Sequence, residues 1–117
     1  MLRVTSSQRG QLSERARGRF HSELLACLRA TFPAAFTQRG PTASAQFVRV
    51  GLARSRELGF RSARDVGRFV ALFYGLGLAL FESPRYAWAR DILADEALAP
   101  GYKLDRIQRR LATGEDA

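Results

Sequence analysis

Hydrophobic residues recur at helical spacing along most of the chain. Between positions 7 and 32 they return every four residues from Leu12 onward, which places them on one face of a helix. Ser6 or Ser7 can cap the start of this helix. Pro33 ends it, because a residue that precedes proline is displaced from the helical region. The pattern predicts a first helix with a single apolar stripe.

Residues 33–44 contain two prolines, one glycine and three hydroxyl side chains, which is typical of a connection between helices. A second helix follows and is predicted to stop at Gly59, because glycine adopts the left-handed conformation without a Cβ penalty. Ser62 and Asp65 form a variant capping box. We therefore predict a third helix over 63–81, apolar all round in its second half and the most buried element of the fold.

The remaining segments predict two shorter helices. Ser83 and Pro84 combine a cap with a proline at the first helical position, where the missing amide hydrogen costs nothing. Pro100 and Gly101 interrupt the chain again before a last short helix. No strand-like alternation lasts beyond four residues. We predict an all-α, single-domain bundle of four to five helices over residues 1–117, with loose ends at 1–10 and 113–117.

Length and residue counts exclude several classes of site and location. A chain of 117 residues is one domain in size. A single cysteine and a single histidine exclude an intramolecular disulfide and a zinc site built from Cys and His ligands. The first residues lack the apolar stretch of a secretory signal, and the longest apolar run falls short of the roughly 20 residues that span a bilayer. We therefore expect a cytoplasmic protein that does not enter membranes.

Residues that could act in catalysis or bind metal ions form no recognisable motif. His21 lies one position off the apolar stripe, and we interpret it as a structural or surface residue because the sequence places no nucleophile or carboxylate beside it. Cys27 is interpreted as a small hydrophobe. We predict a protein that is not an enzyme, with no catalytic, cofactor-binding or metal residues and no cofactor. The later acids are expected to form a solvated face and to pair with neighbouring cations, namely Asp91, Asp95, Glu96 and Asp105 with Arg90, Lys103, Arg106, Arg109 and Arg110.

The positive charge is the feature of the sequence that most directly suggests a binding function. The formal net charge is +8, and eighteen of the nineteen basic residues are arginines. Residues 1–60 contain ten arginines and three acids, so this half accounts for +7. If the first two helices are neighbours, their arginines share a surface that attracts an anionic partner; simple solubility is the alternative. The predicted partner-binding residues are Arg15, Arg49, Arg54 and Arg56, with Tyr74 and Tyr86 as anchors if they are exposed.

Residues 47–70 were also compared with a DNA-reading helix-turn-helix, because two helices here flank a short glycine turn. The position six residues after Gly59 should be apolar in that motif, and it is Asp65. The second helix also becomes too apolar after Val66 to lie in a DNA groove. We therefore rank DNA reading below protein binding.

Two segments carry a family resemblance. Residues 47–60, with the following Ser62 to Val66, and residues 84–93, with Trp88 after the proline, resemble small helical bacterial proteins encoded beside toxin effectors of the type VI secretion system and near its spike genes. The resemblance covers roughly residues 20–112. This chain departs from the family at 77–83, where the family has several aspartates and this chain has mainly apolar residues.

The resemblance implies that the gene lies beside the gene of a secreted toxin, and it implies no catalytic residues in this chain. We therefore expect a non-enzymatic adaptor or chaperone that binds an acidic or amphipathic surface of a toxin effector or spike component. Two alternatives stay open: a basic nucleic-acid-binding domain, and an immunity protein for the adjacent toxin. The immunity role ranks lower because proteins that neutralise nuclease toxins are often acidic. The sequence leaves the oligomeric state open.

Overall fold

The computed structural model describes residues 6–114, with side chains from Arg15 onward. Every element in that range is helical, and no strand is present among them. The predicted all-α class is confirmed, whereas the predicted count of four to five helices is not. In chain order the elements are α1 (Ser6–Thr31), α2 (Pro33–Glu57), α3 (Ala63–Leu76), α4 (Ala79–Glu82), the 3-10 helix η1 (Pro84–Tyr86), α5 (Ala87–Ala94) and α6 (Pro100–Thr113).

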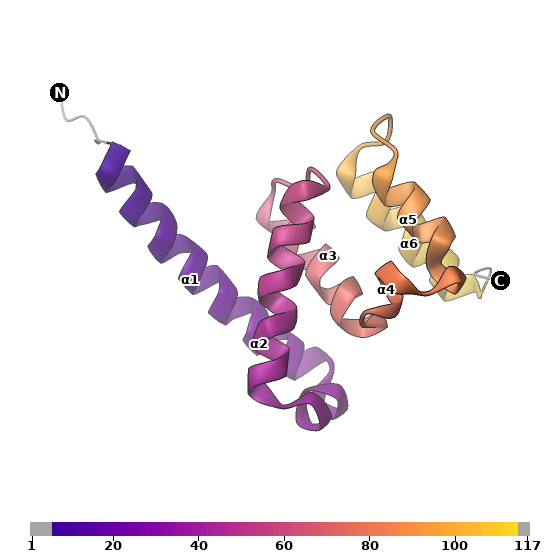
Figure 1. The fold of residues 1–117 in the computed structure, drawn as a ribbon, viewed down its shortest axis with the longest axis horizontal. Coiled ribbons are helices and arrows are strands. Elements are labelled where there is room, and N and C mark those ends of the chain that lie inside the picture. Colours follow the sequence, from indigo (N-terminus) through magenta and orange to yellow (C-terminus); the bar gives the residue numbers. More distant parts are fainter. Residues whose placement is uncertain (1–5, 115–117) are drawn as a thin grey trace.

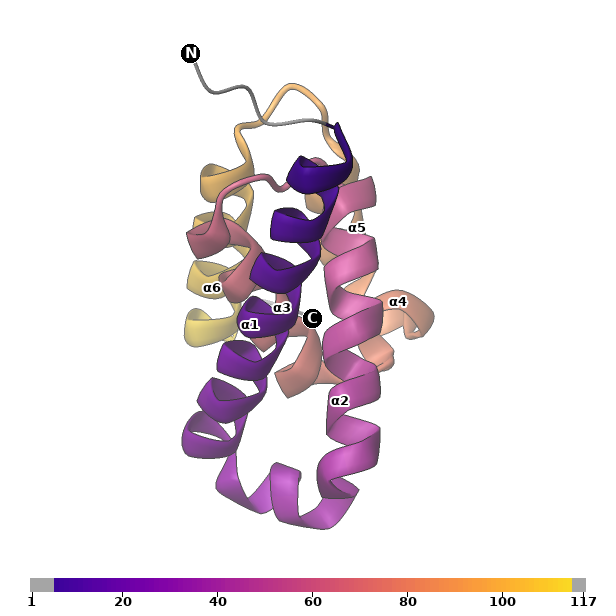
Figure 2. The same ribbon diagram turned by 90° about the vertical axis from the view of Figure 1, so that its left-hand side faces the viewer.

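Two antiparallel helix pairs meet on α3. Helices α1 and α2 run in opposite directions beside each other, and α5 and α6 form the second pair on the other side of the molecule (Figure 1 and Figure 2). α3 packs against α1, α2, α4 and α6. The first part of α1 projects beyond its neighbours, and residues 15–19 are all exposed (Figure 1). Leu12, the first residue of the predicted apolar stripe, lies outside the described side chains; of the following stripe residues, Ala16 is exposed and Phe20 is partly covered.

α3 is the most buried helix, as its apolar run predicted. The hydroxyl of Ser62 caps it by accepting a hydrogen bond from the amide of Asp65 at 3.1 Å. Six of its side chains are buried, including Phe69 and Phe73, whose rings are stacked on each other and meet the Phe81 ring of α4 in tilted and edge-on contacts. Burying side chains of this size contributes roughly 1.5–3 kcal/mol each. α3 therefore holds the two helix pairs together.

Two glycines shift helix boundaries from the predicted positions. The predicted helix 63–81 ends at Leu76, because Gly77 has φ 72° and ψ −160°. The segment 33–44, predicted as a connection, is instead helical on both sides of a kink at Gly40, where φ is 85°. A positive φ strains any residue with a Cβ atom, so each glycine fixes the place where a helix breaks. The predicted fourth helix begins as η1, and its α-helical part starts at Ala87.

Three cationic side chains cap helices at their C-terminal ends, each from a different element. Carbonyl groups in the last turn of a helix have no amide partner in that helix, and the dipole favours positive charge there. Arg39 Nη1 donates to the carbonyl of Tyr74 in α3 at 2.8 Å. Arg90 Nη1 donates to the carbonyls of Leu80 (2.9 Å) and Ser83 (2.8 Å) at α4. Lys103 Nζ donates to the carbonyl of Leu93 in α5 at 2.8 Å.

Candidate functional site

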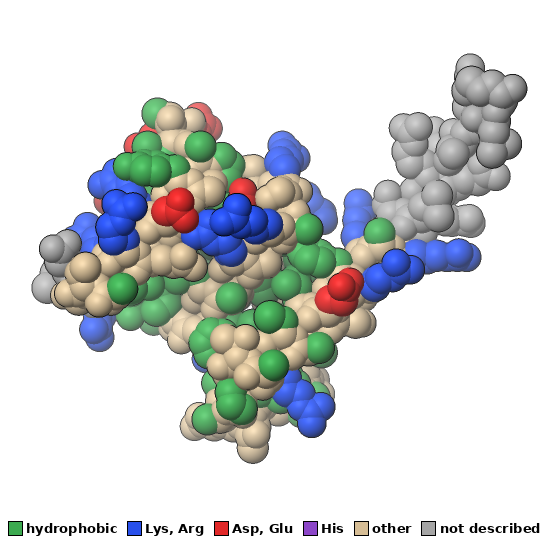
Figure 3. Space-filling model, turned by 180° about the vertical axis from the view of Figure 1, so that it is seen from behind, with side chains coloured by type: hydrophobic (Ala, Val, Ile, Leu, Met, Phe, Trp, Pro, Cys, Tyr) green, Lys and Arg blue, Asp and Glu red, His purple; other side chains and the backbone are tan. Residues whose placement is uncertain are grey.

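The four predicted partner-binding arginines do not share one patch. Arg15 lies on the projecting part of α1 and is exposed. Arg54 and Arg56 lie on different sides of α2: the Arg54 guanidinium is 4.8 Å from the ring centroid of Phe81 in α4, whereas Arg56 lines a hollow with Phe20 of α1. Figure 3 shows basic side chains spread along the back of the molecule instead of gathered on one element. The predicted common surface is therefore divided between the two sides of α2.

Tyr74 is buried, so it cannot be the exposed binding anchor predicted from the sequence. Its side chain is 0% exposed, and its hydroxyl lies 2.7 Å from the hydroxyl of Ser44 in α2. It packs between Phe32 and Phe47, so it belongs to the core. Tyr86 is half-buried, and the Arg85 guanidinium lies 5.7 Å from its ring centroid. Only Tyr86 offers part of its ring at the surface.

An apolar groove runs between α2 and the turn that joins α3 to α4. Two of the large exposed hydrophobic side chains, Val50 (38% exposed) and Leu78 (56%), line it together. The groove has a volume of about 240 Å³. Its other lining residues are Ala43, Gln46, Phe47 and Phe73, of which only Gln46 is polar.

Two of the predicted arginines border this apolar groove. Arg49 is exposed and donates a hydrogen bond to the side chain of Gln46, which lines the groove. Arg54 follows Val50 by one helical turn, and half of its side chain is exposed. Glu57 lies 3.6 Å from Arg54, but this pair is solvent-exposed and contributes little. The groove therefore combines an apolar floor with positive charge along its α2 edge.

The predicted helix over 63–81 placed Leu78 inside a continuous buried element. The structure exposes Leu78 because α3 stops at Gly77 and the chain turns. The sequence signal at this point is the glycine pair at 75 and 77, where the missing side chains allow a neighbouring helix to pack closely. Gly75 fits that interpretation, since a Cβ atom there would lie 3.4 Å from the Phe32 ring. Gly77 instead ends the helix.

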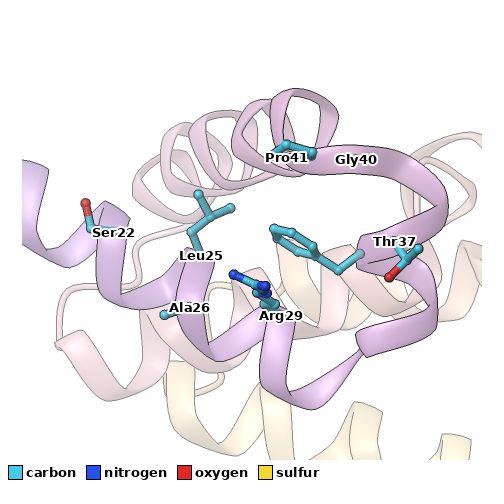
Figure 4. A pocket seen from close by; sticks show the side chains of 8 residues that line it. Ser22, Leu25, Ala26, Arg29, Thr37, Gly40 and Pro41 are labelled. Atoms are coloured by element: carbon cyan, nitrogen blue, oxygen red, sulfur yellow. The ribbon is translucent and has the colours of Figure 1, made fainter.

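A second hollow, of about 610 Å³, lies where α1 diverges from the first turns of α2. Leu25 points into it from α1, with Arg29 at its base and Gly40 and Pro41 on the far side (Figure 4). Phe36 of α2 also lines it. The Arg29 guanidinium is 5.9 Å from the Phe36 ring centroid. The kink at Gly40 opens this hollow, because it turns the first segment of α2 away from α1.

The helix-turn-helix alternative is disfavoured by the position of its second helix. That helix would be α3, and six of its side chains are buried against other parts of the chain. A recognition helix must expose the side chains that read base edges in the major groove. α3 is therefore in the wrong place for DNA reading, for the reason that its apolar run indicated.

Residues capable of catalysis or metal binding are scattered. His21 is half-buried, and its Nε2 atom has no hydrogen-bond partner among the described residues. Cys27 is exposed, contrary to its interpretation as a buried small hydrophobe, and its Sγ lies 3.9 Å from the hydroxyl of Thr31. Among the side chains of residues 15–114, no three His, Cys, Asp or Glu come together as metal ligands. None of the helices in that range is long and apolar enough to cross a membrane.

The ion pairs expected near the C-terminal end are largely replaced by other contacts. Asp105 pairs with Arg68 of α3 at 2.6 Å, not with a cation of its own helix. Lys103 and Arg90 donate to backbone carbonyls, as described above. Asp91, Asp95 and Glu96 are exposed and form no ion pair with another described residue. The predicted solvated face is therefore confirmed for these three acids, whereas the predicted pairing is not, since Arg90 and Lys103 bind backbone carbonyls instead of carboxylates.

Comparison with known proteins adds no relative. No family model matches the chain, and neither the curated proteins nor the solved structures include a significant match.

Proposed function

We propose that this chain is a non-enzymatic protein-binding accessory, an adaptor or chaperone for a secreted toxin effector of the type VI secretion system. The observation that carries the proposal is the apolar groove, in which Val50 and Leu78 are both exposed beside Arg49 and Arg54. The matching partner segment is amphipathic, with apolar side chains for the groove and acidic side chains for its α2 edge.

The energetics favour such a segment. Fully burying one Val- or Leu-sized side chain contributes roughly 1.5–3 kcal/mol. A groove of about 240 Å³ accommodates the apolar side chains of a short segment and would cover Val50 and Leu78 at the same time. Charges at the edge of an interface contribute mainly to the association rate and to the choice of partner. We therefore assign affinity to the groove and specificity to the arginines.

The family resemblance supplies the class of partner. Segment 47–60, which resembles proteins encoded beside type VI toxin effectors, contributes Phe47 and Val50 to the groove and contains both edge arginines. The departure at 77–83 places Leu78 where the family has an acidic segment. We propose that the partner of this chain correspondingly meets an apolar wall there.

The test is a pull-down from the native bacterium with the tagged chain, nuclease added, in about 0.15 M and about 0.5 M salt, where screening lengths are about 8 Å and under 5 Å. Recovery of a toxin effector or a spike protein at both salt concentrations supports the proposal. The double variant Val50→Gln/Leu78→Gln should lose that partner. Tyr102→Gln, which replaces an exposed aromatic residue of α6, is the matched control and should retain it. Equal recovery with both variants would overturn the proposal.

A nucleic-acid-binding function is the second candidate, and the net charge of +8 favours it. Such binding depends on the release of counterions, so its affinity falls steeply with added salt. Recovery of only nucleic acid or ribosomal proteins, lost in about 0.5 M salt, would favour this function over the adaptor. The immunity role is distinguished by a third observation, namely inhibition of the toxin by the purified chain.

A further inference from the structure

The hollow between α1 and the first segment of α2 has the size of a small-molecule site. Its volume of about 610 Å³ is within the range of roughly 300–1,000 Å³ that is usual for ligand pockets. It lies at the end of the helix pair where α1 and α2 are joined, away from the projecting start of α1 (Figure 1). This α1–α2 hollow shares no lining residue with the apolar groove, so it is a separate site.

The walls of the α1–α2 hollow are mainly apolar. Leu25 and Ala26 belong to α1, and Phe36 and Pro41 belong to α2. Leu25 and Phe36 are half-buried, so part of each side chain remains in contact with water. The kink at Gly40, where φ is 85°, keeps the first segment of α2 from closing over this surface. A ligand with an apolar body would remove the surface from water, which is favourable.

Arg29 supplies the single charge among the described residues that line the α1–α2 hollow. Its guanidinium lies over the Phe36 ring at 5.9 Å from the centroid, and no ion pair within residues 15–114 involves it. A guanidinium group presents a planar fork of N–H donors that can hold both oxygens of a carboxylate. One cation beside an apolar wall therefore complements a ligand with an apolar body and one negative charge.

We propose that the α1–α2 hollow binds an amphipathic monocarboxylate, namely a medium-chain fatty acid. Its alkyl chain lies against Leu25, Phe36 and Pro41, and its carboxylate pairs with Arg29. Each methylene group that becomes buried raises the affinity about fourfold. The ion pair is exposed and adds a factor of about two to five. The alkyl chain therefore determines the affinity, and the arginine determines the orientation of the ligand and the preference for an anion.

Nuclear magnetic resonance of the isotope-labelled protein locates and measures this binding. Titration with decanoate below its micellar concentration should shift the amide signals of residues 22–29 and 36–40 to saturation, with one site per protein. Octanoate should bind up to about fifteenfold more weakly, because two methylene groups are missing. Decyltrimethylammonium has the same alkyl chain and the opposite charge, and it should bind at least threefold more weakly than decanoate. Acetate, which lacks the alkyl chain, should not saturate the site.

Two variants test the two parts of the site separately. Ala26→Phe fills the α1–α2 hollow without changing the charge and should weaken decanoate binding at least tenfold. Arg29→Gln removes the cation and should weaken it about two- to fivefold. The matched controls are Ala16→Phe and Arg19→Gln, which change exposed positions of the same helix outside the hollow and should leave the affinity unchanged. Circular dichroism should show equal helix content in all four variants.

Three results would overturn the proposal. Equal weakening by Arg29→Gln and Arg19→Gln would show that net charge alone attracts the ligand. Amide shifts centred on Val50 and Leu78 would place decanoate in the apolar groove instead of the α1–α2 hollow. An absence of saturable shifts with millimolar decanoate would show that the hollow holds only water.

Discussion

Arg39 is the cation whose replacement tests the packing of this fold most sharply. Its guanidinium lies 4.4 Å from the ring centroids of both Phe47 and Tyr74, and it donates to the Tyr74 carbonyl at 2.8 Å. It also contacts the turn at Gly77, where an added Cβ atom would lie 3.4 Å from Nη2. One side chain thus caps α3 and joins it to α2. Arg39→Met keeps much of the aliphatic volume and removes the charge, the hydrogen bond and the planar stacking.

The expected loss follows from these contacts. A hydrogen bond from a charged donor contributes about 1.5–3 kcal/mol, and each cation–π contact about 0.5–1 kcal/mol. The three contacts share one guanidinium and are not additive, and methionine retains part of the packing. We therefore expect Arg39→Met to lower the free energy of unfolding by about 2 kcal/mol, or the Tm by roughly 6–12 °C. Arg39→Lys keeps the charge and loses the stacking, so it should cost about half as much.

Urea denaturation followed by circular dichroism measures both variants, with Arg49→Met as the control. Arg49 is an exposed arginine of the same helix that contacts only Gln46, so its replacement should change stability by less than about 0.5 kcal/mol. If Arg39→Met matched this control, the capping and ring contacts would contribute nothing and the reasoning would be wrong. An unchanged m-value in all variants ensures that the comparison concerns the same unfolding transition.

Three further predictions use the same denaturation assay. Tyr74→Phe and Ser44→Ala should each lower the free energy of unfolding by about 1–3 kcal/mol, because each leaves one buried hydroxyl without its partner. The double variant should lower it by less than the sum of the two, and strict additivity would contradict the hydrogen bond. Lys103→Met should cost about 1–2 kcal/mol, because the Leu93 carbonyl loses a charged donor; a stabilised variant would show that burial of the ammonium outweighs this capping. Gly77→Ala should cost about 1 kcal/mol or more, because φ is 72° there, and a neutral result would argue against the turn.

The sequence predicted helix identity better than helix length. Periodicity located α1, the second part of α2, α3 and α6, because each must direct one apolar face to a shared core. The helix end at Gly77 was missed for a physical reason: glycine is tolerated inside helices and also ends them, and only tertiary packing decides between the two outcomes. The opposite error was made over 33–44, where a connection was predicted and the structure has helix on both sides of Gly40. Both glycines now lie beside hollows, since a helix that breaks leaves space next to its neighbour.

The candidate site was predictable in its charge and not in its shape. Arg49 and Arg54 were identified as partner-binding residues, and both border the apolar groove. The groove itself requires Val50 of α2 and Leu78, which are 28 positions apart, to line one depression. Helical spacing describes only neighbours within one element, so it could not find this pair. The same limit explains Tyr74, whose position on an apolar helix gave no indication of its buried bond to Ser44.

The cations of this chain fall into groups with different functions, and this decides which of them can test binding. Arg39, Arg90 and Lys103 donate to carbonyls at helix ends that come close only when the chain folds. Replacing them removes positive charge and stability together, so a loss of binding would report partial unfolding as readily as a lost contact. Among the described residues, Arg49 and Arg54 at the groove are exposed, and their polar contacts are with the side chains of Gln46 and Glu57. Experiments on binding must therefore change these exposed residues, with loss of equal charge elsewhere as the control, before net charge can be separated from a specific site.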